Sequence, residues 1–421
     1  MIRSLLNKFF YDQGVVVLLG GTVLAQLVPL MVAPALTRTF TPDQFGALAL
    51  LMAWFNPLSY FASGRFDVAV VLPKEEKEAR HLIIGAILVS FCLALLVSCI
   101  ESIAFWAGLR AEFSITMFVI LPLLLFFTGI YQPLSFYLQR HKRYKFLAIS
   151  KVSQTSVIAI ASIALGYLGY WSGLMWGYLS GWVVLGLLSL IFFFRSGLHL
   201  EVKPFAAVKL TLKKYKDYPL INAPTSFLHA LTISIPVFLI TEYFSRADAG
   251  YLNLARQILI IPTSLIATAF SQVYFESFAS AVREQQPVGA LLRSKMKPLF
   301  VLALLFLVPL LFFAPQIFQW YFGDPWELSG IICAALAPVM ALQFLVLPVS
   351  SLLPAIGKIR ITAAWQFSYF LLILSLWFFK DLGLHQFILV YALIDLLAYF
   401  VFLLIILRFA SKFDRQLSLT A

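Results

Sequence analysis

The strongest constraint in this sequence is a series of long apolar stretches, separated by short polar segments, along the whole chain. A helix needs about 20 mostly apolar residues to cross the hydrocarbon core of a membrane. The chain is 62% hydrophobic and 12% charged, whereas soluble domains contain about 25% charged residues. We therefore expect an all-α integral membrane protein, and we exclude a soluble enzyme, a disordered chain and a disulfide-stapled secreted domain. The sequence predicts twelve spanning helices, at about residues 14–36, 45–72, 82–107, 113–138, 147–170, 173–194, 218–243, 249–279, 299–322, 328–354, 361–379 and 385–408.

The distribution of the 31 Lys and Arg residues predicts the orientation of the chain. With a cytoplasmic N-terminus, 25 of them fall in cytoplasmic segments, a group in which we count Lys151 near the start of the fifth span. Cytoplasmic loops of membrane proteins carry an excess of Lys and Arg, so we expect both termini in the cytoplasm. The net charge of +12 is then a topology signal, and we expect no nucleic-acid partner. The four cations on the other side are Arg38, Arg110, Arg246 and Lys380.

An internal repeat divides the predicted spans into two halves. Residues 40–50 and 244–254 share the pattern F-[ST]-x4-G-x-L-x-L, and residues 133–138 resemble residues 348–353 in the same order. Six spans per half make the two repeats parallel, and substrate sites in transporters built this way lie between the halves near the midplane of the bilayer. We expect an N-terminal six-helix bundle at residues 1–195, a cytoplasmic linker at 196–217 and a C-terminal bundle at 218–421.

The segment QLVPLMVAPALTRTFTPDQFGALAL (residues 26–50), followed by GRFDVAVVLP (residues 64–73) and a charged loop, resembles the start of Wzx-type flippases. These proteins move O-antigen and capsule repeat units and belong to the multidrug/oligosaccharidyl-lipid/polysaccharide (MOP) exporter superfamily. The resemblance implies a V-shaped pair of bundles, related to that of MATE transporters, that works by alternating access. It implies transfer of an undecaprenyl-pyrophosphate-linked oligosaccharide from the cytoplasmic to the periplasmic leaflet of the inner membrane, with no cofactor.

Partners also follow from this interpretation. We expect the lipid-linked oligosaccharide and membrane lipids as binding partners, together with the polysaccharide polymerase and chain-length machinery. A monomer is the simplest expectation, since two halves already form one translocation path. Cys92, Cys99 and Cys333 lie in predicted spans without His or carboxylate neighbours, so we expect no metal site.

Two other functions compete with this one. A multidrug exporter of the same superfamily typically carries an acidic residue in a span such as the first, where this chain has Thr22 and Gln26 as its polar members. An integral-membrane polymerase or ligase needs catalytic groups in a substantial loop, and the predicted periplasmic joins are short. We expect no enzyme and keep the multidrug exporter as the alternative.

Two arginines inside predicted spans are candidate substrate-binding residues, because a charge at membrane depth costs about 2.5–3.5 kcal/mol and marks a functional site by default. Arg65 lies in the second span and Arg256 in the equivalent eighth span. A planar guanidinium matches the oxygens of a pyrophosphate in two hydrogen bonds. Asp67, two residues after Arg65, is a further candidate substrate-binding residue. Alternatively, Arg65 pairs with Asp67 or another helix, or extends to the cytoplasmic interface.

Two further ionisable residues lie near the middle of predicted spans. Asp395, with no cation nearby in the sequence, would be protonated there and is a candidate for coupling transport to protons. Alternatively, Asp395 is a neutral acid that is hydrogen-bonded to a neighbouring helix and has no part in coupling. His229 is a candidate for lining a polar cleft, for packing between helices or for relaying protons.

Four prolines are candidate hinges, because a proline inside a helix removes a backbone hydrogen bond and tends to kink it. Pro29 and Pro34 fall in the first span, and Pro224 and Pro236 in the equivalent seventh span. The alternative is that transmembrane helices simply tolerate proline.

Overall fold

The computed structural model describes residues 13–108, 115–195 and 205–420, which are helical almost throughout and contain no strand. Eleven of the described helical segments are long and apolar enough to cross a membrane. This confirms the predicted all-α membrane fold. Helix α11, which covers the eighth predicted span, is not among the eleven, so the count of twelve spans and the cytoplasmic termini stay predictions.

The chain divides into two compact units, Met1–Ser234 and Ile235–Ala421, with the division inside α10. We call them the N-terminal and C-terminal units. The predicted domain boundaries stay predictions, and the first part of the predicted linker, residues 196–204, lies outside the described residues. The rest of that linker contains α9, which packs against α5.

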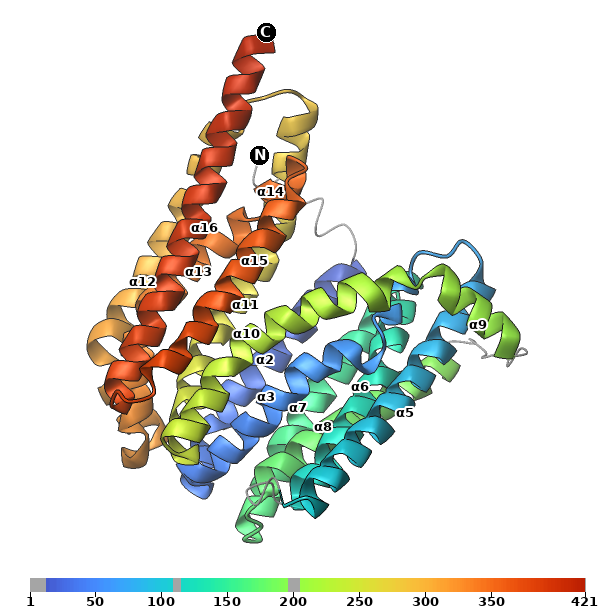
Figure 1. Cartoon of the computed structure of the whole chain (residues 1–421), viewed down its shortest axis with the longest axis vertical. Helices are drawn as coiled ribbons and strands as arrows, with labels where there is room; N and C mark the ends of the chain where they lie inside the picture. The colour runs from blue at the N-terminus through green and yellow to red at the C-terminus, as the bar shows by residue number, and fades with distance from the viewer. Residues whose placement is uncertain (1–12, 109–114, 196–204, 421) are drawn as a thin grey trace. The chain divides into compact units, whose positions relative to one another are not determined.

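The N-terminal unit is a bundle of long helices in which α5, α6 and α8 run side by side (Figure 1). Helix α7 packs between α2 and α8. Its elements are α2 (Gln13–Thr39), α3 (Pro42–Ala62), α4 (Phe66–Ala69), α5 (Glu76–Trp106), α6 (Ile115–Arg140), α7 (Tyr144–Tyr167), α8 (Gly173–Arg195), α9 (Phe205–Lys214), the π-helical turn η1 (Tyr218–Asn222) and the first half of α10 (Ala223–Tyr243).

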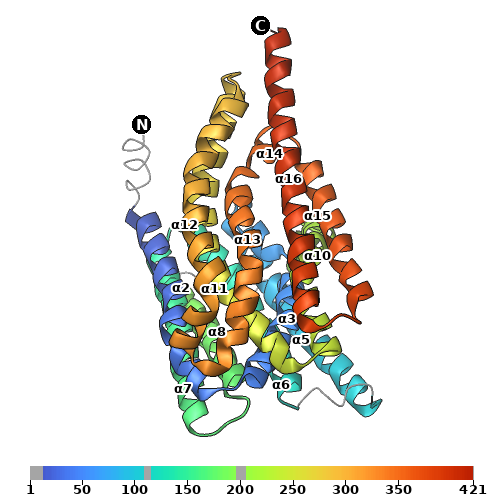
Figure 2. The ribbon, with the colours of Figure 1, turned by 90° about the vertical axis from the view of Figure 1, so that its left-hand side faces the viewer.

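The C-terminal unit is a second bundle, in which α12, α13 and α16 run side by side (Figure 2). Its ends are held partly by side chains: Asp414 of α16 accepts hydrogen bonds from the backbone N–H groups of Val288 and Gly289, at 2.7 and 2.9 Å. These N–H groups at the start of α12 have no partner within their own helix. Its elements are the second half of α10, α11 (Arg246–Arg283), α12 (Val288–Phe322), η2 (Asp324–Trp326), α13 (Glu327–Val349), α14 (Leu352–Ala355), α15 (Ile359–Leu374), η3 (Ser375–Phe379) and α16 (Leu384–Thr420).

Small residues allow helices to approach closely, as is common between membrane helices. A side-chain carbon added at Gly330 of α13 would lie 2.5 Å from Pro315 Cα and 2.7 Å from Ala314 O, both in α12. The same addition at Gly20 of α2 meets nothing within 4 Å. The first glycine is therefore required by packing, and the second is not.

These two glycines give a matched test of the packing. We expect Gly330→Ala to lower the midpoint of thermal unfolding in detergent, since overpacking costs about 1–3 kcal/mol. Gly20→Ala should leave the midpoint unchanged or raise it, because alanine favours a helix by about 0.5–1 kcal/mol over glycine. Equal midpoints for the two variants would contradict this account of the contact between α12 and α13.

Candidate functional site

Arg65 lies at a break in the second predicted span, which the sequence analysis took as continuous over residues 45–72. Helix α3 ends at Ala62, and α4 begins at Phe66. Between them, Gly64 and Arg65 both have a φ of 57°. Glycine adopts this left-handed conformation readily, whereas another residue pays about 1–2 kcal/mol. Strained residues of this kind persist where the surroundings hold them and are frequent at functional sites.

The break is held by its own hydrogen bonds. Backbone bonds run from Gly64 N to Phe61 O, at 2.9 Å, and from Phe66 N to Ser63 O, at 3.1 Å. The Ser63 hydroxyl donates to Asp67 Oδ1 at 2.5 Å, and the Asp67 side chain is 1% exposed. In this structure Asp67 therefore supports the turn from inside the protein, and it acts on Arg65 through electrostatic attraction.

The guanidinium of Arg65 is oriented by a neighbouring helix. Its Nε donates to Asn222 Oδ1 at 2.7 Å, and its central carbon lies 5.4 Å from the centre of the Tyr60 ring. Beside it, the rings of Phe61 and Phe227 are 5.2 Å apart and join α3 to α10. Among the described residues, the two terminal nitrogens of Arg65 make no hydrogen bond, which leaves the fork that recognises phosphate groups available.

Asn222 is the last residue of η1, the π-helical turn that precedes α10. Such turns are rare and frequently lie at functional sites. The sequence analysis did not single out this residue. A polar residue two positions before Pro224, at the start of a predicted span, was the available signal.

A second polar cluster lies in the C-terminal unit, where α11, α15 and α16 bring Arg256, Tyr369 and Asp395 together. The Asp395 side chain is 3% exposed, and the Tyr369 hydroxyl donates to its Oδ1 at 2.7 Å. Tyr391, one turn before Asp395 on α16, bonds the same carboxyl group, and Arg256 lies close enough to act on both electrostatically. The sequence found no cation near Asp395, but the fold supplies one.

Aromatic rings fix this cluster in place. Trp365 stacks on Tyr369, with centroids 5.4 Å apart and planes 8° from parallel. Trp365 also stacks on Phe402, with ring centroids 4.0 Å apart and ring planes 12° from parallel. Stacked rings with few rotatable bonds hold the Tyr369 hydroxyl toward the carboxyl group.

The remaining predicted site residues lie elsewhere on the same helices. His229 is exposed on α10, and Pro224 occupies the second position of that helix, after the π-helical turn. Pro236 lies inside α10, and Pro29 and Pro34 lie inside α2, which is continuous through both. The structure does not test whether these prolines act as hinges.

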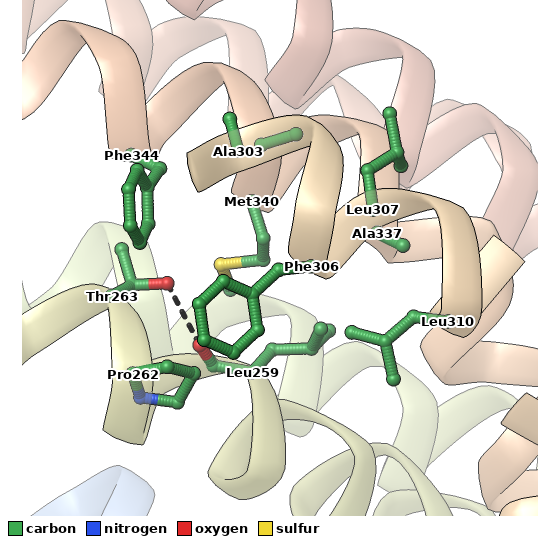
Figure 3. A pocket seen from close by; sticks show the side chains of 11 residues that line it. Leu259, Pro262, Thr263, Ala303, Phe306, Leu307, Leu310, Ala337, Met340 and Phe344 are labelled. Atoms are coloured by element: carbon green, nitrogen blue, oxygen red, sulfur yellow. Dashed lines mark hydrogen bonds between the residues drawn. The ribbon is translucent and has the colours of Figure 1, made fainter. Parts of the chain in front are cut away.

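The C-terminal unit also contains a small apolar groove between α11, α12 and α13, with a cavity volume of about 20 Å³. Figure 3 shows that the Thr263 hydroxyl, a polar group in this lining, turns back to donate to Leu259 O at 2.8 Å. The lining of the groove is therefore apolar. Its lining is Leu259, Pro262, Thr263, Ala303, Phe306, Leu307, Leu310, Ala337, Met340, Ala341 and Phe344.

Comparisons with known proteins support this fold. Residues 35–330 match a family model described as polysaccharide biosynthesis protein. No curated protein matches the chain. At 13–16% identity, the similar solved structures show the fold alone.

Three of these structures illustrate the similarity. An inward-facing multidrug resistance MATE family transporter of the MOP superfamily is 16% identical with a TM-score of 0.72, over 93% of this chain and 96% of that one. The lipid II flippase MurJ, in an inward closed conformation, is 13% identical with a TM-score of 0.73, over 96% of this chain and 91% of that one. A MOP superfamily transporter from Pyrococcus furiosus is 15% identical with a TM-score of 0.57, over 96% of each chain.

The bond between Tyr369 and Asp395 gives a test of the second cluster. We expect Tyr369→Phe to destabilise the protein by about 0.5–1.5 kcal/mol, because it removes one of the two hydroxyl donors to a buried carboxyl group. Thermal unfolding in detergent measures the effect. The control is Tyr399→Phe, which alters a tyrosine of the same cluster that is not hydrogen-bonded to Asp395. If both variants unfold at the same temperature as the wild type, the proposed importance of this bond is wrong.

Proposed function

This chain belongs to the polysaccharide biosynthesis protein family, and from that membership we propose that it is a flippase for lipid-linked oligosaccharides. The proposed substrate is a repeat unit carried on undecaprenyl pyrophosphate, for O-antigen, capsule or exopolysaccharide. It is moved from the cytoplasmic to the periplasmic leaflet of the inner membrane by alternating access. A fold shared with a lipid II flippase and with MATE transporters supports transport as the activity.

The observation that carries the proposal is the presentation of Arg65. A strained turn places this arginine between helices, Asn222 fixes its Nε, and the described residues leave its two terminal nitrogens unbonded. A pyrophosphate that leaves water needs such donors to replace its hydration, and a guanidinium binds phosphate oxygens in pairs. We assign the pyrophosphate to Arg65 in the N-terminal unit and to Arg256 in the C-terminal unit.

Asp395 is assigned to coupling, on the basis of its position beside Arg256. An ionised Asp395 attracts Arg256 and competes with a substrate phosphate for the same cation. When Asp395 takes up a proton, its attraction for Arg256 weakens, and the interaction of Arg256 with the phosphate strengthens. Tyr369 and Tyr391 stabilise the ionised form, because both bond the carboxyl group.

The other assigned residues support these two arginines. Asp67 holds the turn that presents Arg65, and His229 contributes a polar side chain on α10, the helix that follows Asn222. Pro29 and Pro34 in α2, with Pro224 and Pro236 in α10, are proposed to allow bending during transport. We propose that the protein is a monomer and not an enzyme. It delivers the transported repeat unit to the polysaccharide polymerase and chain-length machinery.

One alternative function is export of apolar drugs, which is supported by the fold shared with a multidrug resistance MATE transporter. A drug exporter needs a mostly apolar pocket and has no requirement for arginines aimed at a pyrophosphate. A deletion strain that becomes drug-sensitive while its surface polysaccharide stays normal would support this alternative over the flippase.

Replacing the two arginines tests the main proposal. In a deletion strain complemented with Arg65→Ala or Arg256→Ala, we expect surface polysaccharide to fall at least tenfold, since a charged hydrogen bond contributes about 1.5–3 kcal/mol. Lipid-linked repeat units should accumulate in the cytoplasmic leaflet. Arg65→Lys should restore part of the export, because lysine keeps the charge but lacks the paired donors.

The matched control for these variants is Arg415→Ala, which removes an exposed arginine near the end of α16. This variant should export as the wild type does. Normal export by both Arg65→Ala and Arg256→Ala, at equal protein levels, would refute the assignment of the pyrophosphate to these residues.

Asp395→Asn tests the coupling. This change removes the titrating proton and keeps a side chain of the same shape that still accepts from Tyr369. We expect export that no longer responds to a protonophore, whereas wild-type export should fall when the proton gradient collapses. If the variant and the wild type respond equally, Asp395 does not couple transport to protons.

A further inference from the structure

Lys151 is a charged residue in a helix that is long and apolar enough to cross a membrane, and the function described so far does not use it. It is seven residues beyond the start of α7, which corresponds to about 10 Å along the helix. Its side chain is half-buried in the bundle. Its Nζ lies 3.4 Å from Thr22 Oγ1 of α2.

The side chain lies where α2 and α7 approach each other closely. A side-chain carbon added at Gly21 would lie 2.5 Å from Ala148 Cβ. Lys151 and Thr155 follow Ala148 by three and seven residues, so all three share the side of α7 that faces α2. Thr22, Gln26, Lys151 and Thr155 form what we call the polar seam.

No acidic partner neutralises Lys151 among the described residues. The ion pairs in this part of the chain involve Glu76 and Glu78, and no acidic group acts on Lys151 electrostatically. Its recorded bond goes to a neutral hydroxyl, which itself donates to Leu18 O at 2.8 Å. Charged groups inside a membrane are normally paired, so a bound anion would complete this site.

We propose that Lys151, with Thr22, is an anion-binding site of the N-terminal unit, separate from Arg65. Its ligand is a negatively charged oxygen group of the lipid-linked oligosaccharide, either a phosphate or the carboxylate of an acidic sugar, so the inference rests on the proposed function. A lysine provides a compact charge with three donors that accepts either group without a fixed planar geometry. The seam's hydroxyl and amide side chains are typical of a site that orients a polar ligand.

Binding to the purified protein in nanodiscs tests the site independently of transport. The probes are farnesyl pyrophosphate for the phosphate, a disaccharide containing a uronic acid for the carboxylate, and the matching neutral disaccharide. Lys151→Gln should weaken the binding of one anionic probe at least tenfold, which identifies the source of the charge. Lys151→Arg should bind that probe within a few-fold of the wild type, and Lys145→Gln, an exposed change in the first turn of α7, should have no effect.

Thermal unfolding separates this role from a structural one. If Lys151 serves to bind a ligand, the Lys151→Met variant should unfold at the same temperature as the wild type or higher, because the substitution removes an unpaired charge. A structural lysine would instead give a lower midpoint. Two results overturn the proposal: a wild type that binds neither anionic probe, or a Lys151→Gln variant that binds both as the wild type does. Anion binding without any oligosaccharide transport would leave the site in place and reject the proposed flippase.

Discussion

The architecture depends on one constraint, which is that a chain crossing hydrocarbon must satisfy its own backbone hydrogen bonds. Long helices meet it, and most of the described chain is built from them. An interruption is tolerated only where protein supplies the missing partners. The turn at Ser63–Arg65 meets this condition through two short backbone bonds and the buried Ser63–Asp67 pair. The turn thereby holds one half-buried arginine, Arg65, at a fixed position.

Three cationic side chains in or between these helices have different surroundings. Arg65 is oriented by a neutral amide and keeps its phosphate-binding fork available. Arg256 lies beside the Asp395 carboxyl group, which two tyrosines also bond. Lys151 contacts a neutral hydroxyl at a close approach of two helices. These three arrangements underlie the proposal of an anionic substrate and the proposed coupling role of Asp395.

Much of the fold followed from the sequence, because apolar stretches of spanning length allow few structures other than helices. The break at Gly64–Arg65 was not predicted, because the residues on both sides of it are apolar and together have the length of one span. Contacts between distant elements were also beyond sequence reasoning. Asn222 lies 157 residues from Arg65, and Tyr369 lies on a different helix from Asp395. Tyr391, four residues before Asp395 on the same helix, was open to prediction. The contact between Lys151 and Thr22 also joins distant elements, and the sequence alone did not indicate it.

The most direct measurement of the central claim uses the purified protein in vesicles with an undecaprenyl-pyrophosphate-linked oligosaccharide in the outer leaflet. An added glycosidase that cannot enter the vesicles reports how much substrate remains outside. The account predicts that the protected fraction grows faster with the protein than in protein-free vesicles, and that a neutral lipid-linked sugar without pyrophosphate stays outside. Equal protection with and without the protein would contradict the claim that this chain is a flippase for such lipids.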